Sequence, residues 1–491
     1  MGQPFALQIE EDSRTPLFLR IARAIARDIE RGRLRPGVML PGTRSLAADL
    51  AVNRNTVVAA YHELALQGWI EPQQARGAVV ARNLPAAGDS VALRQRPASG
   101  GARPDTGSLA ADRSPAPLVF SDGTPDPRLV PRVELARAFR RALASPAFLG
   151  PAGYGDPRGS LRLRVALAQW LASTRGLAIG PGDILLTRGS QMALFLAAHA
   201  LAAPGFTIAV EDPGYPLAWA AFRAAGARVA GIPVDREGIS IEALQDLGRS
   251  DRSIRAVLVT PHHQYPTTTT LGAGRRLALL RLAAEYGWVV IEDDYDHEYR
   301  YEGRPVLPLA AADAGGAGGP VIYVGSLSKM LAPGLRLGYV VAAPALLDAM
   351  CTERETIDRQ GDIPLEQAVA ELIEDGELAR HARKARKIYQ QRRDNLVEEL
   401  RRELPEALSF VVPAGGLALW ARVADGLDAS HWASRARKQG LTVSPSARFS
   451  LRHEHPNAFR LGFAAFDNNE IKTAVRRLVA SIPTRTHCSG R

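Results

Sequence analysis

A single lysine lies between two short apolar runs in the segment VIYVGSLSKMLAPGLRLGYVV, residues 321–341. The first run is expected to form a buried strand, and Ser326, Ser328 and Lys329 follow its end. Arg336 comes seven residues after the lysine. Hydroxyls and a guanidinium can hold a phosphate, and a lysine amine can form a Schiff base with an aldehyde. The segment predicts a site for pyridoxal phosphate, and the alternative is a strand-loop with a solvated lysine.

Two further motifs carry polar groups at the ends of predicted strands. TRGSQMAL places Gly189, Ser190 and Gln191 at a strand-to-helix turn, where free N–H groups can bind an anion. EDDYD includes Asp293, which suits a protonated pyridine nitrogen. The alternatives are an ordinary capped helix for the first motif and a metal site or structural acidic turn for the second. No matching set of histidines or cysteines is expected to accompany EDDYD, so no metal is predicted.

Tyrosines lie on the loops beside these motifs. Tyr215 in EDPGYP could stack on a flat cofactor, although a lone loop tyrosine more often packs against protein. Tyr265 follows a predicted strand in PHHQYPTTTT, and Tyr295 could hydrogen-bond a hydroxyl of the cofactor ring.

The length and composition limit the class of protein. A chain of 491 residues exceeds a single hydrophobic core of about 250–300 residues, so more than one domain is expected. A net charge of +10 permits a nucleic-acid partner without requiring one. Cys351 and Cys488 form no CxxC pair, which disfavours a disulfide framework or zinc site. The N-terminal pattern lacks a signal peptide and no apolar run reaches about 18 residues, so a cytoplasmic protein without a membrane partner is expected.

The first part of the chain, residues 12–82, has a helical pattern followed by two β-like runs. Apolar residues recur every four positions from Leu17 to Ile29, which predicts a helix. A short helix to Leu50 and a tight turn then lead to Asn53, which is a good N-cap for a longer helix. Two short β-runs around Arg76-Gly77 follow as a wing.

This order of elements predicts a winged helix-turn-helix. Arg54, Asn55 and Thr56 begin the longer helix, which is the second helix of the helix-turn-helix and the one whose side chains meet base edges and phosphates. The alternative is a small helical subdomain with solvated arginines.

The rest of the chain has two different patterns. Residues 83–117 are rich in Pro, Ala, Gly and Ser, which predicts a flexible linker. From residue 118 to 482, β-like runs alternate with helical stretches, which predicts an α/β sheet with helices on both faces and ligands at the carboxyl ends of the strands. The predicted strands are 184–187, 207–211, 227–234, 255–261, 288–293, 321–325 and 336–342.

Residues 16–82 resemble the GntR-type winged helix-turn-helix. That family reads DNA with an arginine in an LPxxR segment, here Arg44, and with the start of the recognition helix, and its wing glycine matches Gly77. The order of motifs after the linker resembles fold-type I pyridoxal-phosphate aminotransferases. The whole arrangement is similar to the MocR family of bacterial regulators, which implies a multidomain protein of winged helix-turn-helix and α/β type.

The resemblance implies a role for each motif. Lys329 would form the Schiff base with pyridoxal phosphate, Asp293 would bind the pyridine nitrogen, and Tyr265 and Tyr295 would flank the ring. The residues implied around the phosphate are Ser190, Gln191, Ser326, Ser328 and Arg336. Arg460 in FRLGFA would receive a carboxylate, and the alternative is a surface arginine in a strand. The family usually has glycine where this chain has Thr268, which removes easy access to positive φ.

The resemblance also implies a function. A homodimer, with or without exchanged domains, would bind double-stranded operator DNA and sense an amino compound by exchange of the Lys329 aldimine. The alternatives are that pyridoxal phosphate is itself the signal or that the domain is a working aminotransferase. The basic helix around Arg383, Arg386 and Tyr389 would help to form the dimer or would simply be solvated.

Overall fold

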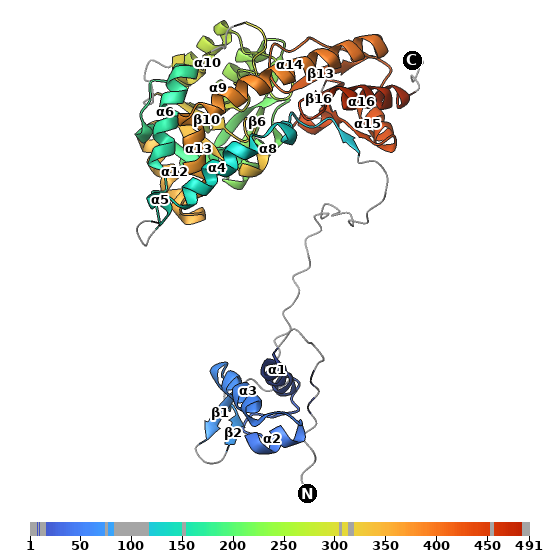
Figure 1. Cartoon of the computed structure of the whole chain (residues 1–491). Coiled ribbons are helices and arrows are strands. Elements are labelled where there is room, and N and C mark those ends of the chain that lie inside the picture. Colours follow the sequence, from blue (N-terminus) through green and yellow to red (C-terminus); the bar gives the residue numbers. More distant parts are fainter. Residues whose placement is uncertain are drawn as a thin grey trace. The chain divides into compact units, whose positions relative to one another are not determined.

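The computed structural model describes residues 7, 9, 16–73, 77–82, 117–149, 154–303, 307–312, 319–451 and 456–483. The chain divides into two compact units, residues 1–112 and 113–491 (Figure 1). The predicted linker, apart from residue 117, and the predicted turn residue Arg76 lie outside the described residues.

The first unit has the predicted order of elements. Its helices and strands are α1 (Leu17–Glu30), α2 (Thr43–Asp49), α3 (Arg54–Leu66), β1 (Ile70–Gln73) and β2 (Gly77–Val80). The Asn53 side chain accepts a hydrogen bond from the Asn55 amide at 2.8 Å, which caps α3 as predicted. The strands pair antiparallel, and the apolar stripe of α1 packs with α3 in one core. The winged helix-turn-helix prediction is therefore confirmed.

The second unit is built on an eight-stranded mixed sheet. Strands β10 to β6 are parallel, whereas β11 is antiparallel to both neighbours and β7 is antiparallel to β6. The seven predicted strands are all present, and β7 is an addition. In spatial order the strands are β4 (Ile184–Thr187), β11 (Gly338–Val341), β10 (Val321–Ser326), β9 (Val289–Asp294), β8 (Ile254–Val259), β5 (Thr207–Asp212), β6 (Arg228–Asp235) and β7 (Gly238–Ile239).

Helices cover both faces of this sheet, as predicted. Successive residues of a strand point to opposite faces, so Ile322 and Val324 join one core and Tyr323 joins another. The first face is covered by α7 (Ser190–Ala200), α8 (Pro216–Ala224) and α12 (Pro344–Ile357). The second face is covered by α6 (Leu161–Arg175), α9 (Ile241–Ser250), α10 (Ala273–Tyr286) and α13 (Ile363–Glu374), with α4 (Arg132–Leu143) packed on α13.

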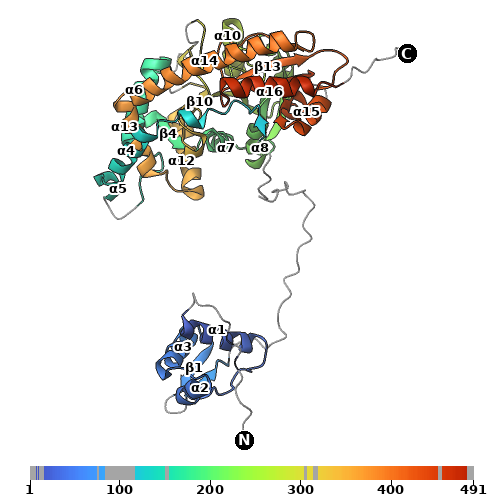
Figure 2. The same cartoon turned by 45° about the vertical axis from the view of Figure 1, so that its right-hand side comes forward.

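A smaller antiparallel sheet follows the long helix α14 (Glu377–Glu403). Its strand order is β12 (Leu408–Ser409), β13 (Ala418–Val423), β16 (Ala458–Gly462) and β15 (Ser444–Pro445). A parallel pair, β3 (Leu118–Val119) with β14 (Leu441–Thr442), and helices α15 (Ala429–Lys438) and α16 (Asn468–Ala480) complete this part. Figure 2 shows α14 reaching from the helices near the large sheet to α16.

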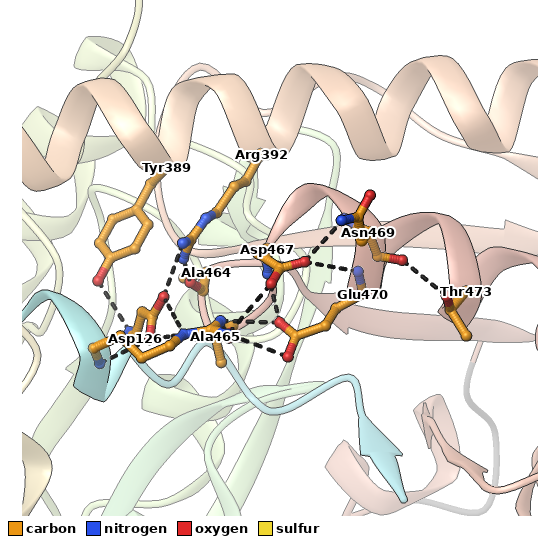
Figure 3. Close-up of polar contacts among 10 residues, drawn as sticks. Asp126, Tyr389, Arg392, Ala464, Ala465, Asp467, Asn469, Glu470 and Thr473 are labelled. Atoms are coloured by element: carbon orange, nitrogen blue, oxygen red, sulfur yellow. Dashed lines mark hydrogen bonds and ion pairs between the residues drawn. The ribbon is translucent and has the colours of Figure 1, made fainter. Parts of the chain in front are cut away.

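A buried carboxylate ties the chain that enters the second unit to α14 (Figure 3). Asp126 pairs with Arg392 of α14 at 2.8 Å, and the Tyr389 hydroxyl accepts the Asp126 amide at 3.0 Å. Burial alone would raise the pKa of Asp126, but the hydrogen bonds from Arg128 and Arg392 lower it. Tyr389 is thus buried within its own chain, while Arg383 and Arg386 are exposed.

Among the helices that the structure describes, none combines the length and apolar composition that a membrane crossing requires.

Candidate functional site

Lys329 lies three residues past the end of β10, at the carboxyl edge of the large sheet. Its Nζ atom is 4.4 Å from the centroid of the Tyr295 ring. Desolvation of the amine lowers the pKa of Lys329 to about 8, even though nearby carboxylates act in the opposite direction. A lysine with a lowered pKa has an appreciable uncharged fraction near neutral pH, and this form is the nucleophile.

Asp293 occupies the same edge on the neighbouring strand β9, in register with Val324 of β10. Its side chain is buried, and its Oδ1 atom has no hydrogen-bond partner among the described residues. Burial raises the pKa of Asp293 to about 7, partly offset by the charge of Lys329. A buried carboxylate with an unsatisfied oxygen is costly, so the site fits a ligand that brings a proton donor such as a pyridinium nitrogen.

The start of α7 and the loop after β10 meet because β11 pairs with both β4 and β10. Gly189 has φ +79°, and a Cβ atom there would lie 3.0–3.2 Å from the Arg336 guanidinium. Arg336 donates to the Arg188 carbonyl at 2.9 Å. The Ser328 hydroxyl oxygen is buried without a hydrogen-bond partner in the described part of the chain, and the Ser326 hydroxyl accepts the Ser328 amide at 3.3 Å. This gathering of donors suits a phosphate.

Gln191 differs from its neighbours in the predicted phosphate set. Its side-chain amide donates to the Leu217 carbonyl at 2.6 Å, which ties α7 to the start of α8. Ser190 begins α7, so its backbone lies at the helix N-terminus where anions bind. The structure thus brings both residues to the predicted phosphate end, with the Gln191 amide already engaged.

The three predicted tyrosines form one aromatic cluster with Phe449. The rings of Tyr215 and Tyr265 are edge-to-face at 5.0 Å between centroids, and Tyr265 and Tyr295 are 6.1 Å apart. The Tyr295 hydroxyl donates to the His263 carbonyl at 2.7 Å, so its proton is engaged within the protein. Tyr295 can therefore meet a cofactor hydroxyl only as an acceptor in this arrangement.

Arg460 lies on β16 and is only 1% exposed, so the interpretation as a surface arginine is wrong. Its guanidinium carbon is 4.4 Å from the centroid of the Tyr265 ring, and its Nη1 donates to the Pro266 carbonyl at 2.6 Å. No carboxylate within the described ranges forms an ion pair with it. A buried cation without a counter-ion suits a ligand carboxylate.

Gly123 shows that Arg460 and Lys329 border the same space, and sequence reasoning missed this residue. A Cβ atom on Gly123 would lie 3.5 Å from Arg460 Nη2 and 3.7 Å from Lys329 Nζ. Its φ of +86° also favours glycine. The Asp-Gly pair in SDGTPDP signals a turn, but nothing in its spacing indicates that the turn faces residues more than 200 positions away.

The expectation that no histidines accompany the acidic EDDYD motif is wrong. His262 Nδ1 lies 3.5 Å from Asp294 Oδ1, and His297 Nδ1 lies 3.0 Å from Asp294 Oδ2. Asp294 ends β9, and His262 and His297 lie in the loops after the adjacent parallel strands β8 and β9, which brings the three residues together. Their ligand-type atoms lie within 4.8 Å of one another, a set that could hold a metal ion. Asp294 already accepts a hydrogen bond from Tyr323 at 2.5 Å, and Arg175 lies 3.8 Å from it, which disfavours a further cation.

The predicted DNA-binding residues lie in the first unit. Arg44 is exposed on α2, and Arg54 and Asn55 are exposed in the first turn of α3, where Thr56 is half-buried. Gly77 begins the wing strand β2 with φ +103°. Arg54, Asn55 and Thr56 thus lie at the start of the recognition helix, whose N-terminal residues contact base edges in such domains.

Comparisons with known proteins agree with this geometry. Residues 17–80 match the model of bacterial regulatory proteins of the gntR family, and residues 128–478 match that of class I and II aminotransferases. The chain is 31% identical to the probable rhizopine catabolism regulatory protein MocR of Rhizobium meliloti, over 96% of this chain and 95% of that protein. It is also 31% identical to the pyridoxine biosynthesis regulator PdxR of Corynebacterium glutamicum, over 96% of each chain.

A solved structure supports the cofactor. The aminotransferase LysN of Thermus thermophilus, complexed with N-(5'-phosphopyridoxyl)-L-leucine, has a TM-score of 0.68 and 30% identity, over 74% of this chain and 92% of that chain. The gntR-family unit implies DNA binding, and the aminotransferase-like fold implies a dimer. The chain therefore belongs to the MocR family of transcriptional regulators, in which a GntR-type DNA-binding unit is joined to an aminotransferase-like unit, and its cofactor is pyridoxal phosphate.

Proposed function

We propose that the second unit senses a small amino acid-like effector and thereby changes how the first unit binds operator DNA. When bound, pyridoxal phosphate supplies an aldehyde that condenses with primary amines. The observation that carries the proposal is that Lys329 Nζ and the Arg460 guanidinium border the same space around Gly123. A small molecule that carries both an amine and a carboxylate would place its amine where the Lys329 amine lies and its carboxylate against Arg460.

Each residue has a separate task in this proposal. Lys329 provides the amine that an effector amine must displace, and Asp293 provides the charge that holds the cofactor ring nitrogen. Arg460 takes the effector carboxylate, and the Tyr265 ring limits its position from one side. Ser190, Ser326, Ser328 and Arg336 hold the phosphate and keep the cofactor in place while the amines exchange.

The release of Lys329 offers a way to transmit the signal. Tyr299 donates to the main-chain carbonyl of Lys329 at 3.0 Å, so the loop that carries the lysine is tied to the segment after β9. An effector shifts an equilibrium between conformations only if it binds one of them better. We propose that the lysine-bound and lysine-released states differ in this loop, and that a dimer, with or without exchanged domains, converts the difference into altered spacing of its two DNA-binding units.

The test is to record the visible absorbance and operator affinity of the full-length protein together, with a panel of amino compounds. We expect one compound to shift the band of the lysine-bound cofactor and to change DNA affinity at the same concentrations. The same compound should act weakly on Arg460→Gln. A compound that changes DNA affinity without changing the spectrum would contradict sensing at Lys329.

A complete lysine–aspartate pair also favours a second candidate function, an active aminotransferase. In that case the amino compounds would yield a keto acid with turnover, and DNA affinity would not follow the spectrum. If pyridoxal phosphate is itself the signal, its addition to cofactor-free protein would change DNA affinity without any amino compound. The same set of measurements therefore separates all three functions.

A further inference from the structure

A second cavity, of about 240 Å³, lies in the unit that holds the cofactor site, between the end of α6, the segment after β9 and the start of α14. We call it the arginine pocket. It is smaller than the roughly 300–1,000 Å³ typical of sites for drug-sized ligands, which restricts it to a small molecule. Its lining residues are Trp170, Thr174, Arg175, His297, Glu298, Arg300, Ala379, Ala382, Arg383 and Arg386.

The charges around the arginine pocket do not cancel. Its one carboxylate, Glu298, already accepts a hydrogen bond from the buried Arg175 guanidinium. Arg300, Arg383 and Arg386 form no ion pair within the part of the chain that the structure describes. Three cations around one small cavity favour an anionic ligand.

Two of the residues that line the cavity carry buried polar atoms without a hydrogen-bond partner among the described residues. His297 is 7% exposed, and its Nε2 atom has no hydrogen-bond partner among the described residues. The Nη1 atom of Arg300 is likewise buried and unpartnered, although its Nε donates to the Glu302 carbonyl at 3.0 Å. A buried donor without an acceptor is costly, and an anion in the pocket would give the Arg300 guanidinium the acceptor that it lacks.

We propose that the arginine pocket binds a small carboxylate or phosphate anion, at a site separate from that of the cofactor. Arg300, Arg383 and Arg386 supply the charge, and Ala379 and Ala382 leave room on α14. Carboxylates and phosphates share the geometry that a guanidinium recognises, so both sources are tested.

One short segment connects this pocket to the cofactor site. Asp293 lies at the cofactor site and His297 at the pocket, and Asp294 between them pairs with His297 at 3.0 Å. Tyr299 lies between the pocket residues Glu298 and Arg300, and its hydroxyl donates a hydrogen bond to the Lys329 carbonyl. An anion in the pocket would therefore bias the position of the segment that supports Lys329. This regulatory consequence rests on the proposed function, whereas the binding itself does not.

The experiment is calorimetric titration of inorganic phosphate and, separately, succinate into the cofactor-loaded full-length protein. We expect saturable binding of at least one probe. The double variant Arg383→Gln/Arg386→Gln should weaken it by at least about tenfold, because charge-assisted hydrogen bonds are lost. Saturation by phosphate alone would identify a phosphorylated ligand, and saturation by succinate alone a carboxylate.

The matched control is Lys384→Gln/Lys387→Gln, which removes the same charge from exposed positions of α14 that do not line the pocket. Its affinity should change by less than about twofold, as expected for screened surface charges. Equal weakening in the two double variants, or no saturable binding of either probe, would overturn the site. If the anion binds as expected but leaves operator affinity and absorbance unchanged, the site stands and only its coupling to the proposed function fails.

Discussion

The Tyr299 hydroxyl donates a hydrogen bond of 3.0 Å to the main-chain carbonyl of Lys329, which joins the segment after β9 to the lysine loop after β10. Tyr299 is fully buried and packs edge-to-face on Tyr389 of α14 at 5.2 Å between ring centroids. Lys329 is therefore positioned by a tyrosine that itself packs against α14.

Tyr299→Phe should lower the affinity for pyridoxal phosphate several-fold, because the Lys329 loop loses its anchor. Leaving the carbonyl without a donor should also lower the free energy of unfolding by about 1–3 kcal/mol. Tyr301→Phe is the matched control, since the Tyr301 hydroxyl donates to the Gly416 carbonyl at 2.6 Å and does not contact Lys329. Equilibrium titration with the cofactor distinguishes them, and equal affinities in the two variants would remove the anchoring role.

Lys329→Ala should abolish the visible absorbance band that appears when pyridoxal phosphate is added, while the protein stays folded. The alanine removes the amine whose pKa is lowered to about 8 by desolvation, and the phosphate-binding groups remain. Lys384→Ala, at an exposed position on α14, should keep the band. An unchanged spectrum in Lys329→Ala would exclude this lysine from the site.

Asp293→Asn should stabilise the cofactor-free protein but weaken its cofactor binding. Burial raises the pKa of Asp293 from 3.8 in the unfolded chain to about 7 in the folded protein. The unfolded chain therefore loses this proton first, and folding stability falls as the pH rises from 3.8 to 7. The asparagine avoids that loss. The free energy of unfolding of the cofactor-free variant should therefore exceed that of the natural protein by roughly 1–4 kcal/mol above pH 7, and differ little from it below pH 3.8.

Thermal unfolding with and without pyridoxal phosphate measures both effects of Asp293→Asn. The variant should unfold at a higher temperature than the natural protein when cofactor is absent, and the cofactor should add less stabilisation to it. An identical gain from cofactor in both proteins would show that Asp293 does not contact the ligand.

Thr268→Gly should raise the free energy of unfolding. Thr268 has φ +65°, in the region where a side chain costs about 1–2 kcal/mol, against about 0.5–1 kcal/mol for the greater freedom of glycine in the unfolded chain. The backbone thus keeps the conformation that the usual glycine adopts easily, and the Thr268 amide donates to the Gln264 carbonyl at 2.7 Å. Thr268→Ala retains a Cβ atom, so its free energy of unfolding should rise little. A lower free energy of unfolding in the glycine variant would show that the Thr268 backbone is not strained.

Arg54→Ala should weaken specific operator binding by about 1–3 kcal/mol if the arginine makes a bidentate contact with a base. The residue is exposed in the first turn of α3, beside the capping Asn53. Arg31→Ala removes the same charge at an exposed position that follows α1. Affinity measured over a range of salt concentrations distinguishes a base contact from a phosphate contact, because the loss of a phosphate contact alone would weaken binding to all DNA sequences uniformly.

The sequence by itself determined the local structure and the order of motifs. The four-residue apolar period of α1, the Asn53 cap and the short β-branched runs of the large sheet depend on neighbours in the chain, and the structure confirms them. The resemblance also identified the family and the cofactor, which the comparisons bear out. The small antiparallel sheet was not predicted, because strands of two residues such as β12 and β15 have no readable period.

Only the tertiary structure decided which groups share a space. Parallel pairing of β8 with β9 brings His262 against Asp294 and His297, and the turn at Gly123 faces both Lys329 and Arg460. The burial of Arg460 likewise follows from the pairing of β16 with β13 and β15. Such contacts depend on strand order and loop direction, which arise from packing between distant parts of the chain and leave no local pattern in the sequence.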